Sequence, residues 1–418
     1  MDSKPSLRAW SMWAVALVFF AYQFIMRLFP GLVMHDIMAK HHIDVLAFGV
    51  LSSMYYFGYA AMQIPVALLL DRFGPRKVIS LCALICSLAT LLFVYATSWQ
   101  VVLLARCLIG VGSAAGFLGT SKVISSIFPE QQYAKMIGLS FTVGLAGALY
   151  GGKPVSLLIA TSGWEKVGAL VGICGLCFAA LSWCVLQPMV QTHNTPRAPI
   201  FKSLGQLFRN RYLIALAVAN LLMVGSLEGF ADVWGVSFLT SAFALEKADA
   251  AFVVSCIFLG MLCGGPLLAA LASRWSAYYL VTAGCGLLTA VLFGILLTGF
   301  PNIPYLALCS VLFLVGIFCC YQVLIFAIGS KLVPPELKGV TVAFLNCINM
   351  LGGSFFHLVI GSLLKFSGGE AAESLHTYTP HQFASALSAI PICAVIGALV
   401  VLFVGMRQRR RVREDPCA

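Results

Sequence analysis

Residues 128–152 read FPEQQYAKMIGLSFTVGLAGALYGG, and residues 333–355 read VPPELKGVTVAFLNCINMLGGSF. Each segment opens with proline and glutamate and continues as an apolar run that contains several glycines. The glutamates Glu130 and Glu336 lie 206 residues apart (336 − 130 = 206). A repeat of this length within 418 residues predicts two homologous halves.

The composition excludes an ordinary soluble domain. Of the 418 residues, 61% are hydrophobic and 10% are charged, and the mean hydropathy is +0.96. A soluble domain carries roughly 25% charged residues. A chain of this length cannot wrap a core large enough to bury so much apolar surface, whereas lipid solvates it directly. We therefore expect an all-α membrane protein whose constant partner is the lipid bilayer.

Twelve apolar runs are long enough to cross a bilayer as helices. They cover residues 10–33, 46–70, 78–97, 100–127, 136–160, 165–187, 212–241, 249–272, 278–299, 303–330, 340–366 and 383–405. The proline-containing basic segment between the sixth and seventh runs indicates a cytoplasmic linker. The expected domains are a six-helix bundle at 1–187, the linker at 188–211, a second bundle at 212–406 and a basic cytoplasmic tail at 407–418.

The net charge of +11 is a signal of topology, not of nucleic-acid binding. Of the 26 Lys and Arg residues, 18 lie in the N-terminal stub, in alternate loops and in the tail. The intervening loops hold only Lys40, Lys166, Lys247 and Lys365. The positive-inside rule then predicts that both termini are cytoplasmic. A bacterial inner membrane is the expected location.

Cofactor chemistry finds no support in the sequence. The 15 cysteines lie mostly inside apolar runs, without the histidine-backed spacing of a metal site. We therefore read them as small hydrophobic residues and expect no metal. No phosphate-binding G-x-x-x-x-G-K-[ST] loop is present, so ATP is not the expected direct energy source. The expectation is no cofactor, with a proton gradient as the source of energy.

Residues 71–77 read DRFGPRK, between the second and third runs. This stretch resembles the loop signature of the major facilitator superfamily, roughly G-x-x-x-D-R-x-G-R-[RK]. It departs from the signature at Ala67, which replaces the first glycine, and at Pro75, which displaces the basic pair. The resemblance implies a conformational latch in this loop.

Two further stretches carry the same resemblance. Arg106-x-x-x-Gly110-x-Gly112 is similar to the family's helix 4 signature, and PPELKG at 334–339 resembles its loop before helix 11. Gly110 also lies 206 residues before Gly316 (316 − 110 = 206). The resemblance spans the chain and implies the fold of that superfamily, with twelve helices in two pseudo-symmetric bundles. We expect such a transporter to work as a monomer.

The latch is expected at the cytoplasmic ends of the helices. Asp71 ends one run and should be attracted to a helix N-terminus or to Arg72 and Arg76. Glu130 and Glu336, in the repeated loops, are the other expected latch residues. The alternative is that the basic residues only anchor the loop on the cytoplasmic side.

Charges inside the apolar runs are costly, so they are functional candidates. Arg27 lies 17 residues beyond the start of its run and Glu228 lies 16 beyond the start of its own, roughly 24–26 Å along each helix. Asp232 shares a helix face with Glu228. We expect Arg27 to pair with one of these acids as a gate and the other acid, or His357, to carry a proton. Asp232 is the preferred gate residue and Glu228 the preferred proton carrier.

Other interpretations of these charges stay open. Arg27 could extend to the outer headgroups and Lys122 to the cytoplasm. Arg106 could cap backbone carbonyls rather than bind a solute. Lys153 and His357 could belong to the interface between the halves. If the four basic residues line the cavity, they outnumber the two acids and favour an anionic solute.

Polar side chains are expected to complete the cavity. The predicted substrate-binding residues are Tyr22, Gln23, Arg27, Arg106, Lys122, Lys153, Trp234, Tyr321, Gln322, Asn346 and Asn349. The last two could instead bond to a neighbouring helix.

These observations predict a secondary active transporter that works by alternating access, because two bundles can rock about a site at the bilayer midplane. The expected solute is small and anionic or zwitterionic: an organic acid, an amino acid or peptide, or a carboxylate siderophore. Proton symport is the first choice. An uncoupled facilitator and an exporter or antiporter remain alternatives. A membrane-embedded transferase is less favoured, since no convergent set of catalytic residues is evident.

Overall fold

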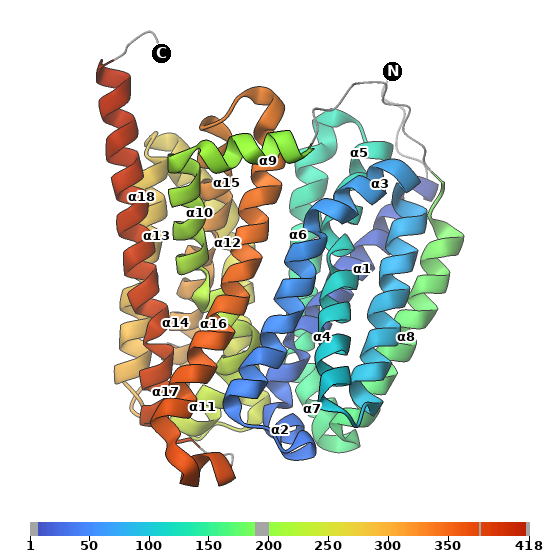
Figure 1. Cartoon of the computed structure of the whole chain (residues 1–418), viewed down its shortest axis with the longest axis vertical. Helices are drawn as coiled ribbons and strands as arrows, with labels where there is room; N and C mark the ends of the chain where they lie inside the picture. Colours follow the sequence, from blue (N-terminus) through green and yellow to red (C-terminus); the bar gives the residue numbers. More distant parts are fainter. Residues whose placement is uncertain (1–6, 189–199, 376–377, 415–418) are drawn as a thin grey trace. The chain divides into compact units, whose positions relative to one another are not determined.

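The structure, a computed structural model, describes residues 7–188, 200–375 and 378–414, and every regular element within these ranges is helical (Figure 1). Contacts group the chain into two units. The first comprises residues 1–194 and 246–255, and the second comprises residues 195–245 and 256–418.

The first unit is built from the helices of the N-terminal half. They are α1 (Leu7–Leu32), α2 (Met34–His41), α3 (Val45–Tyr95), α4 (Trp99–Ser113), α5 (Ala115–Ile127), α6 (Glu130–Gly151), α7 (Lys153–Ser162) and α8 (Trp164–Val185). The first turns of α12 (Lys247–Arg274) also belong to this unit, and the rest of α12 belongs to the second.

The second unit is built from the helices of the C-terminal half. Besides most of α12, they are α9 (Ile200–Arg209), α10 (Arg211–Met223), the π-helix η1 (Gly225–Trp234), α11 (Gly235–Phe243), α13 (Tyr278–Thr298), α14 (Tyr305–Cys319), α15 (Tyr321–Lys331), the 3-10 turn η2 (Pro335–Leu337), α16 (Lys338–Leu375), α17 (Pro380–Leu387) and α18 (Ala389–Glu414).

The described residues hold 11 helical segments long and apolar enough to cross a membrane. One of them, α3, is 51 residues long, and Gly74 interrupts it with φ 77° and ψ 167°. Residues other than glycine rarely adopt such a positive φ, and Pro75 follows directly. Counting α3 as two spans gives the twelve helices expected from the sequence, so the predicted all-α membrane fold is confirmed.

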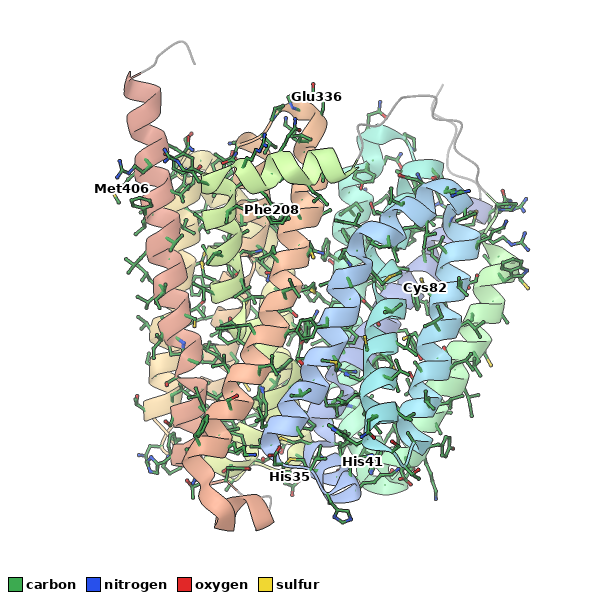
Figure 2. All side chains as sticks on the ribbon, in the orientation of Figure 1. His35, His41, Cys82, Phe208, Glu336 and Met406 are labelled. Atoms are coloured by element: carbon green, nitrogen blue, oxygen red, sulfur yellow. The ribbon has the colours of Figure 1, made fainter. Side chains whose placement is uncertain are left out.

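Three segments outside the twelve expected spans are helical. The short helix α2 was expected to be a loop. Residues 200–209 of the expected linker form α9, whose Leu207 is buried while Phe208 is exposed. Helix α18 continues to Glu414, so residues 407–414 of the expected tail are helical. Phe208 contacts Phe344 with ring centroids 5.3 Å apart, and Figure 2 shows Phe208 and Glu336 toward the same end of the second unit.

Glycines set the same helix crossing in both units. A Cβ added at Gly110 of α4 would overlap the carbonyl oxygen of Tyr55 in α3. A Cβ added at Gly316 of α14 would overlap the carbonyl oxygen of Ile257 in α12. Small residues allow membrane helices to approach this closely. The breaks after α4 and α14 also repeat, because their junctions lie at positions 114 and 320 (320 − 114 = 206).

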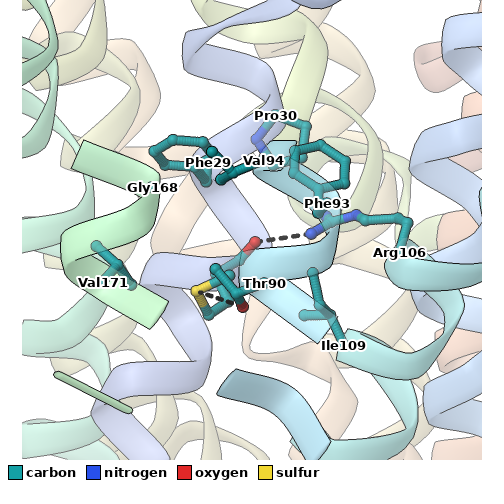
Figure 3. A pocket seen from close by; sticks show the side chains of 10 residues that line it. Phe29, Pro30, Thr90, Phe93, Val94, Arg106, Ile109, Gly168 and Val171 are labelled. Atoms are coloured by element: carbon teal, nitrogen blue, oxygen red, sulfur yellow. Dashed lines mark hydrogen bonds between the residues drawn. The ribbon is translucent and has the colours of Figure 1, made fainter. Parts of the chain in front are cut away.

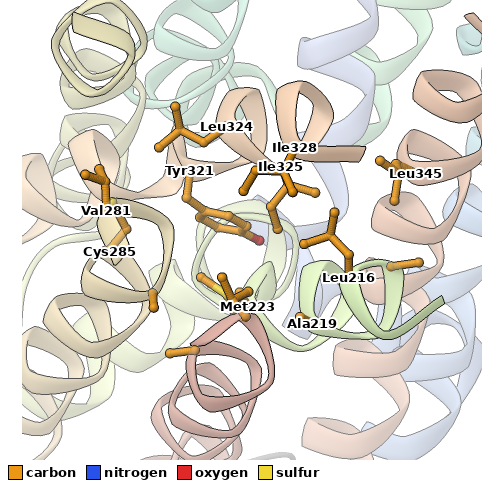
Figure 4. Packing of buried hydrophobic residues seen from close by; sticks show 14 of the residues in the cluster. Leu216, Ala219, Met223, Val281, Cys285, Tyr321, Leu324, Ile325, Ile328 and Leu345 are labelled. Carbon is orange, nitrogen blue, oxygen red and sulfur yellow. The ribbon is translucent and has the colours of Figure 1, made fainter. Parts of the chain in front are cut away.

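The second unit has a continuous apolar core around α10 and α15. Leu216, Met223, Cys285 and Ile325 are among its buried members (Figure 4). The hydroxyl of Tyr321 lies within it and donates to the carbonyl oxygen of Asn220 at 3.2 Å. This carbonyl lies in the last turn of α10, where the helix leaves its final carbonyls without their usual donors. The core therefore also supports the junction between α10 and η1.

Candidate functional site

Arg106 lies deep in the first unit and binds the backbone of α1. Its Nη1 donates to the carbonyl oxygen of Met26 at 2.8 Å (Figure 3). Its Nη2 donates to the carbonyl oxygen of Arg27 at 3.0 Å. The side chain is 1% exposed, and its guanidinium lies 4.7 Å from the ring centroid of Tyr55. Of the two interpretations of Arg106, the structure therefore shows the carbonyl cap, and its predicted contact with a solute stays a prediction.

A small cavity of about 10 Å³ lies beside Arg106 and Thr90. It is lined mainly by apolar side chains from α1, α3, α4 and α8 (Figure 3). This volume is close to the minimum that holds one water molecule. The cavity is therefore too small for an organic solute.

Arg27 is 8% exposed and is surrounded by aromatic rings. Its guanidinium carbon lies 5.4 Å from the ring centroid of Tyr56 and 5.7 Å from that of Phe24. The rings of Tyr55 and Tyr56 meet edge to face, 5.3 Å apart. Cation–π contacts of this kind partly replace the water that a buried guanidinium loses.

Of the other predicted residues of α1, Gln23 is buried and Tyr22 is half-buried. Gln23 is 4% exposed and packs against Gly116 of α5, where an added Cβ would lie 3.0 Å from its side chain. The hydroxyl of Tyr22 donates to the carbonyl oxygen of Val171 in α8 at 3.2 Å. Tyr22 thus joins α1 to α8, and its contact with a solute stays a prediction.

Lys122 forms an ion pair that the sequence did not predict. Its Nζ lies 2.7 Å from Oδ1 of Asp71, and the two side chains are 13% and 30% exposed. The latch aspartate was expected to meet Arg72 or Arg76. The Arg72 and Arg76 guanidiniums lie over aromatic rings, Arg76 at 4.6 Å from the ring centroid of Trp183, and their pairing with Asp71 stays a prediction. Lys122, assigned above to the cavity, is thus a partner of the latch aspartate.

Lys153 also has a carboxylate partner. Its Nζ lies 2.7 Å from Oδ1 of Asp249, in the first turn of α12, and both side chains are about 40% exposed. A second pair, between Lys247 and Asp36, joins α12 to α2 at 3.7 Å. The sequence did not indicate Asp249 and Asp36 as partners, because acids at the ends of apolar runs or between them carry no signal of depth. The pairs Lys122–Asp71 and Lys153–Asp249 therefore neutralise two of the basic residues that supported an anionic solute.

The two acids of the second unit lie in η1. All ten residues of η1 are buried, and Glu228 and Asp232 are 1% and 2% exposed. Glu228 has Cys319 and Tyr321 as electrostatic neighbours, so it faces the break between α14 and α15. π-helical segments occur frequently at functional sites.

Phe356 of α16 packs against Gly225 and Gly229 of η1, and the glycines leave room for its ring. The next residue, His357, is fully buried, and its ring centroid lies 6.5 Å from that of Trp234. The structure thus brings the candidates Trp234 and His357 together within the second unit.

The amides of the second unit complete the predicted set. Asn349 is fully buried, and neither of its amide atoms has a hydrogen-bond partner in the described part of the chain. Gln322, beside Tyr321, has no partner for its Nε2 among the described residues, and Asn346 is half-buried. Buried amides without partners are costly, so they are available to a polar ligand.

The remaining predictions are not tested by contacts within either unit. The pairing of Arg27 with Glu228 or Asp232 joins residues of different units and stays a prediction. Glu336 is exposed in η2, and the side chain of Glu130 lies outside the described residues. Among the described residues, no three His, Cys, Asp or Glu side chains gather in a way that could hold a metal.

Comparisons with known proteins identify relatives of this chain. The family model described as Major Facilitator Superfamily matches residues 12–357. A D-galactonate transporter of Escherichia coli O6:H1 is 26% identical over 393 residues, covering 85% of this chain and 86% of that protein. A protein of Escherichia coli K12 named as a probable galactarate/D-glucarate transporter is 22% identical over 372 residues, covering 78% of this chain and 80% of that protein.

Solved structures share the fold. A bacterial homolog of the human lysosomal transporter Spinster, inward-facing and occupied, has a TM-score of 0.74 and 19% identity over 97% of this chain and 98% of that chain. A nucleoside transporter has a TM-score of 0.75 and 13% identity over 94% of this chain and 99% of that chain. Family match, curated relatives and fold agree, and the chain belongs to the Major Facilitator Superfamily as a multi-pass membrane transporter, not an enzyme.

Proposed function

We propose that this protein is a proton-coupled symporter of a small hydroxylated organic anion of the sugar-acid class. It works by alternating access in a bacterial inner membrane, with both termini in the cytoplasm. It functions as a monomer, needs no cofactor and takes its energy from the proton gradient.

The observation that carries the proposal is the buried arginine pair of the first unit. Arg27 and Arg106 are electrostatic neighbours. The described partners of Arg106 are two carbonyl oxygens and an aromatic ring, none of which cancels its positive charge. A buried fixed charge in a membrane protein marks a solute pathway by default. The positive charge of two adjacent guanidiniums favours a carboxylate-bearing solute, which Arg27 can bind through two hydrogen bonds.

The hydroxyl groups of the solute are inferred from the amides and from the relatives. Asn349 and Gln23 are buried and carry amide atoms that have no hydrogen-bond partner within the ranges that the structure describes. A site with buried, unpaired polar groups selects strongly for a ligand that can pair with them. The relatives named above are, by their names, transporters of D-galactonate and of galactarate or D-glucarate, which supports the same class.

The coupling step is assigned to η1. A carboxylate buried in a membrane protein is far less costly when it is protonated, so Glu228 and Asp232 are suited to carry a proton through an apolar region. Glu228 is the proposed carrier, and Asp232 is the proposed partner of Arg27. His357, beside Trp234, is the next candidate for the proton.

Uptake into proteoliposomes tests the proposal. Wild-type protein with an imposed inward proton gradient should concentrate radiolabelled D-galactonate, and a protonophore should abolish the accumulation. The variant Glu228→Gln should still exchange the solute across the bilayer without responding to the gradient. Glu246→Gln, which changes an exposed acid outside the proposed gate and latch, is the matched control and should behave as wild type. Equilibration without accumulation by the wild type would support an uncoupled facilitator and refute the symport.

A further inference from the structure

We infer that Arg106 is a positioning residue: it holds the turn of α1 that carries Arg27 by bonding the backbone carbonyl that Pro30 leaves without a donor. Only the role of Arg27 as an anion ligand rests on the proposed function. The contact between α4 and α1 stands on the geometry of the first unit.

Pro30 lies inside α1, one turn before its end. Proline has no backbone N–H, and its ring crowds the carbonyl of the residue four positions earlier. That residue is Met26. Inside a bilayer an unpaired carbonyl carries a large penalty, and proline is tolerated where a neighbouring group satisfies it.

Arg106 supplies the missing donor. Its Nη1 donates to the Met26 carbonyl at 2.8 Å, and its Nη2 donates to the next carbonyl, that of Arg27, at 3.0 Å. One planar guanidinium thus spans two consecutive carbonyls, which a single donor cannot do equally well.

A second path joins the same two arginines through side chains. The Arg106 guanidinium lies over the ring of Tyr55, Tyr55 meets Tyr56 edge to face, and the Arg27 guanidinium lies over Tyr56. Backbone and side chain of Arg27 are therefore both held from α4 and α3. Movement of Arg106 should displace the Arg27 guanidinium and weaken the binding of an anion there.

The role of Pro30 provides a specific suppressor. In Pro30→Ala, residue 30 regains an N–H that can bond the Met26 carbonyl, so α1 no longer depends on Arg106. Pro65→Ala, which restores an N–H inside α3 of the same unit, is the matched control.

Hydrogen–deuterium exchange of the full-length protein in nanodiscs measures the hold on α1. In Arg106→Gln, peptides covering residues 27–33 should exchange at least about tenfold faster than in wild type, which equals about 1.4 kcal/mol. Adding Pro30→Ala should return the rate to near that of wild type, and adding Pro65→Ala should not. If both proline substitutions restore the wild-type exchange rate, or if neither does, the inference is overturned. If Arg106→Gln does not fold, Arg106→Lys takes its place and should show the same suppression.

Uptake of D-galactonate separates this inference from the proposed function. Arg106→Gln should raise KM about tenfold, with kcat less affected. Adding Pro30→Ala to this variant should restore the wild-type KM. Unchanged KM with accelerated exchange would overturn the positioning of Arg27. One outcome is that neither the wild type nor any variant transports D-galactonate, while the hydrogen–deuterium exchange rates still follow the expected pattern. In that case the sugar-acid assignment fails, and the contact between Arg106 and α1 stands.

Discussion

The Nζ atom of Lys122 in α5 lies 2.7 Å from Oδ1 of Asp71 in α3, three residues before Gly74 breaks that helix. The ion pair fixes the end of one span to a neighbouring helix of the same unit. Because both side chains are mostly buried, the pair is screened less by salt than a surface pair.

Separating these charges should disturb transport more than stability. Asp71→Asn should slow uptake, because Lys122 then keeps a partly buried charge without this partner. The double exchange Asp71→Lys with Lys122→Asp should recover part of the rate. Uptake together with the accessibility of single cysteines near each face measures the effect. Normal uptake and unchanged accessibility in Asp71→Asn would show that the pair is not a latch.

Lys153 should contribute little to solute affinity. Its charge is neutralised by Asp249, and both side chains are about 40% exposed, so the pair contributes at most about 1 kcal/mol. Lys153→Gln should change KM for an anionic solute by less than about fivefold, which corresponds to that energy. Arg27→Gln should raise KM well beyond this. Equal increases in KM for the two substitutions would indicate that Lys153 belongs to the binding site.

The glycine crossings should tolerate no side chain. Gly110→Ala and Gly316→Ala place a methyl group on a backbone carbonyl of the neighbouring helix. Each should destabilise its unit by about 1–3 kcal/mol, the range for overpacking. Gly138→Ala and Gly284→Ala are controls, because an added Cβ meets nothing within 4 Å there. Thermal unfolding monitored in detergent compares the four variants, and similar midpoints throughout would contradict the crossing.

His41 of α2 should make stability depend on pH. Partial burial, together with the nearby Lys40 and His42, lowers its pKa below the usual 6.5. The unfolded chain therefore binds a proton more readily than the folded one. This penalty is absent above the unfolded pKa and grows as pH falls through it. His41→Gln should flatten the decline of thermal stability between about pH 7 and pH 5. An unchanged slope would exclude His41 as the cause.

Much of the architecture followed from apolar runs alone, because lipid imposes a length and an all-helical backbone on each span. The predicted run 212–241, for example, matches the helical segment Arg211–Phe243 within a few residues. The π-helix inside it was missed, since a change in hydrogen-bond register leaves no periodic signal. Ion pairs such as Lys122 with Asp71 were missed for another reason: a partner 51 positions away in the chain is set by packing.

The arginine cap was only half predictable. A proline inside a membrane helix leaves the carbonyl four residues earlier without its usual donor, so the position of Pro30 implies that Met26 needs one. Which donor arrives depends on how α4 packs against α1. The aromatic surroundings of Arg27 likewise depend on the packing of α3, which the sequence does not encode locally.

The paired glycine crossings have a mechanical consequence. Where α3 meets α4 and α12 meets α14 backbone to backbone, no flexible side chain lies between the helices to absorb sliding. Each pair should act as a stiff strut during the transport cycle. Deformation should then concentrate in interrupted helices outside these two pairs, among them α1 at Pro30 and α10 where it gives way to η1. Arg27, proposed to bind the solute, lies on α1 one turn before Pro30, and Glu228, proposed to bind the proton, lies in η1 directly after α10.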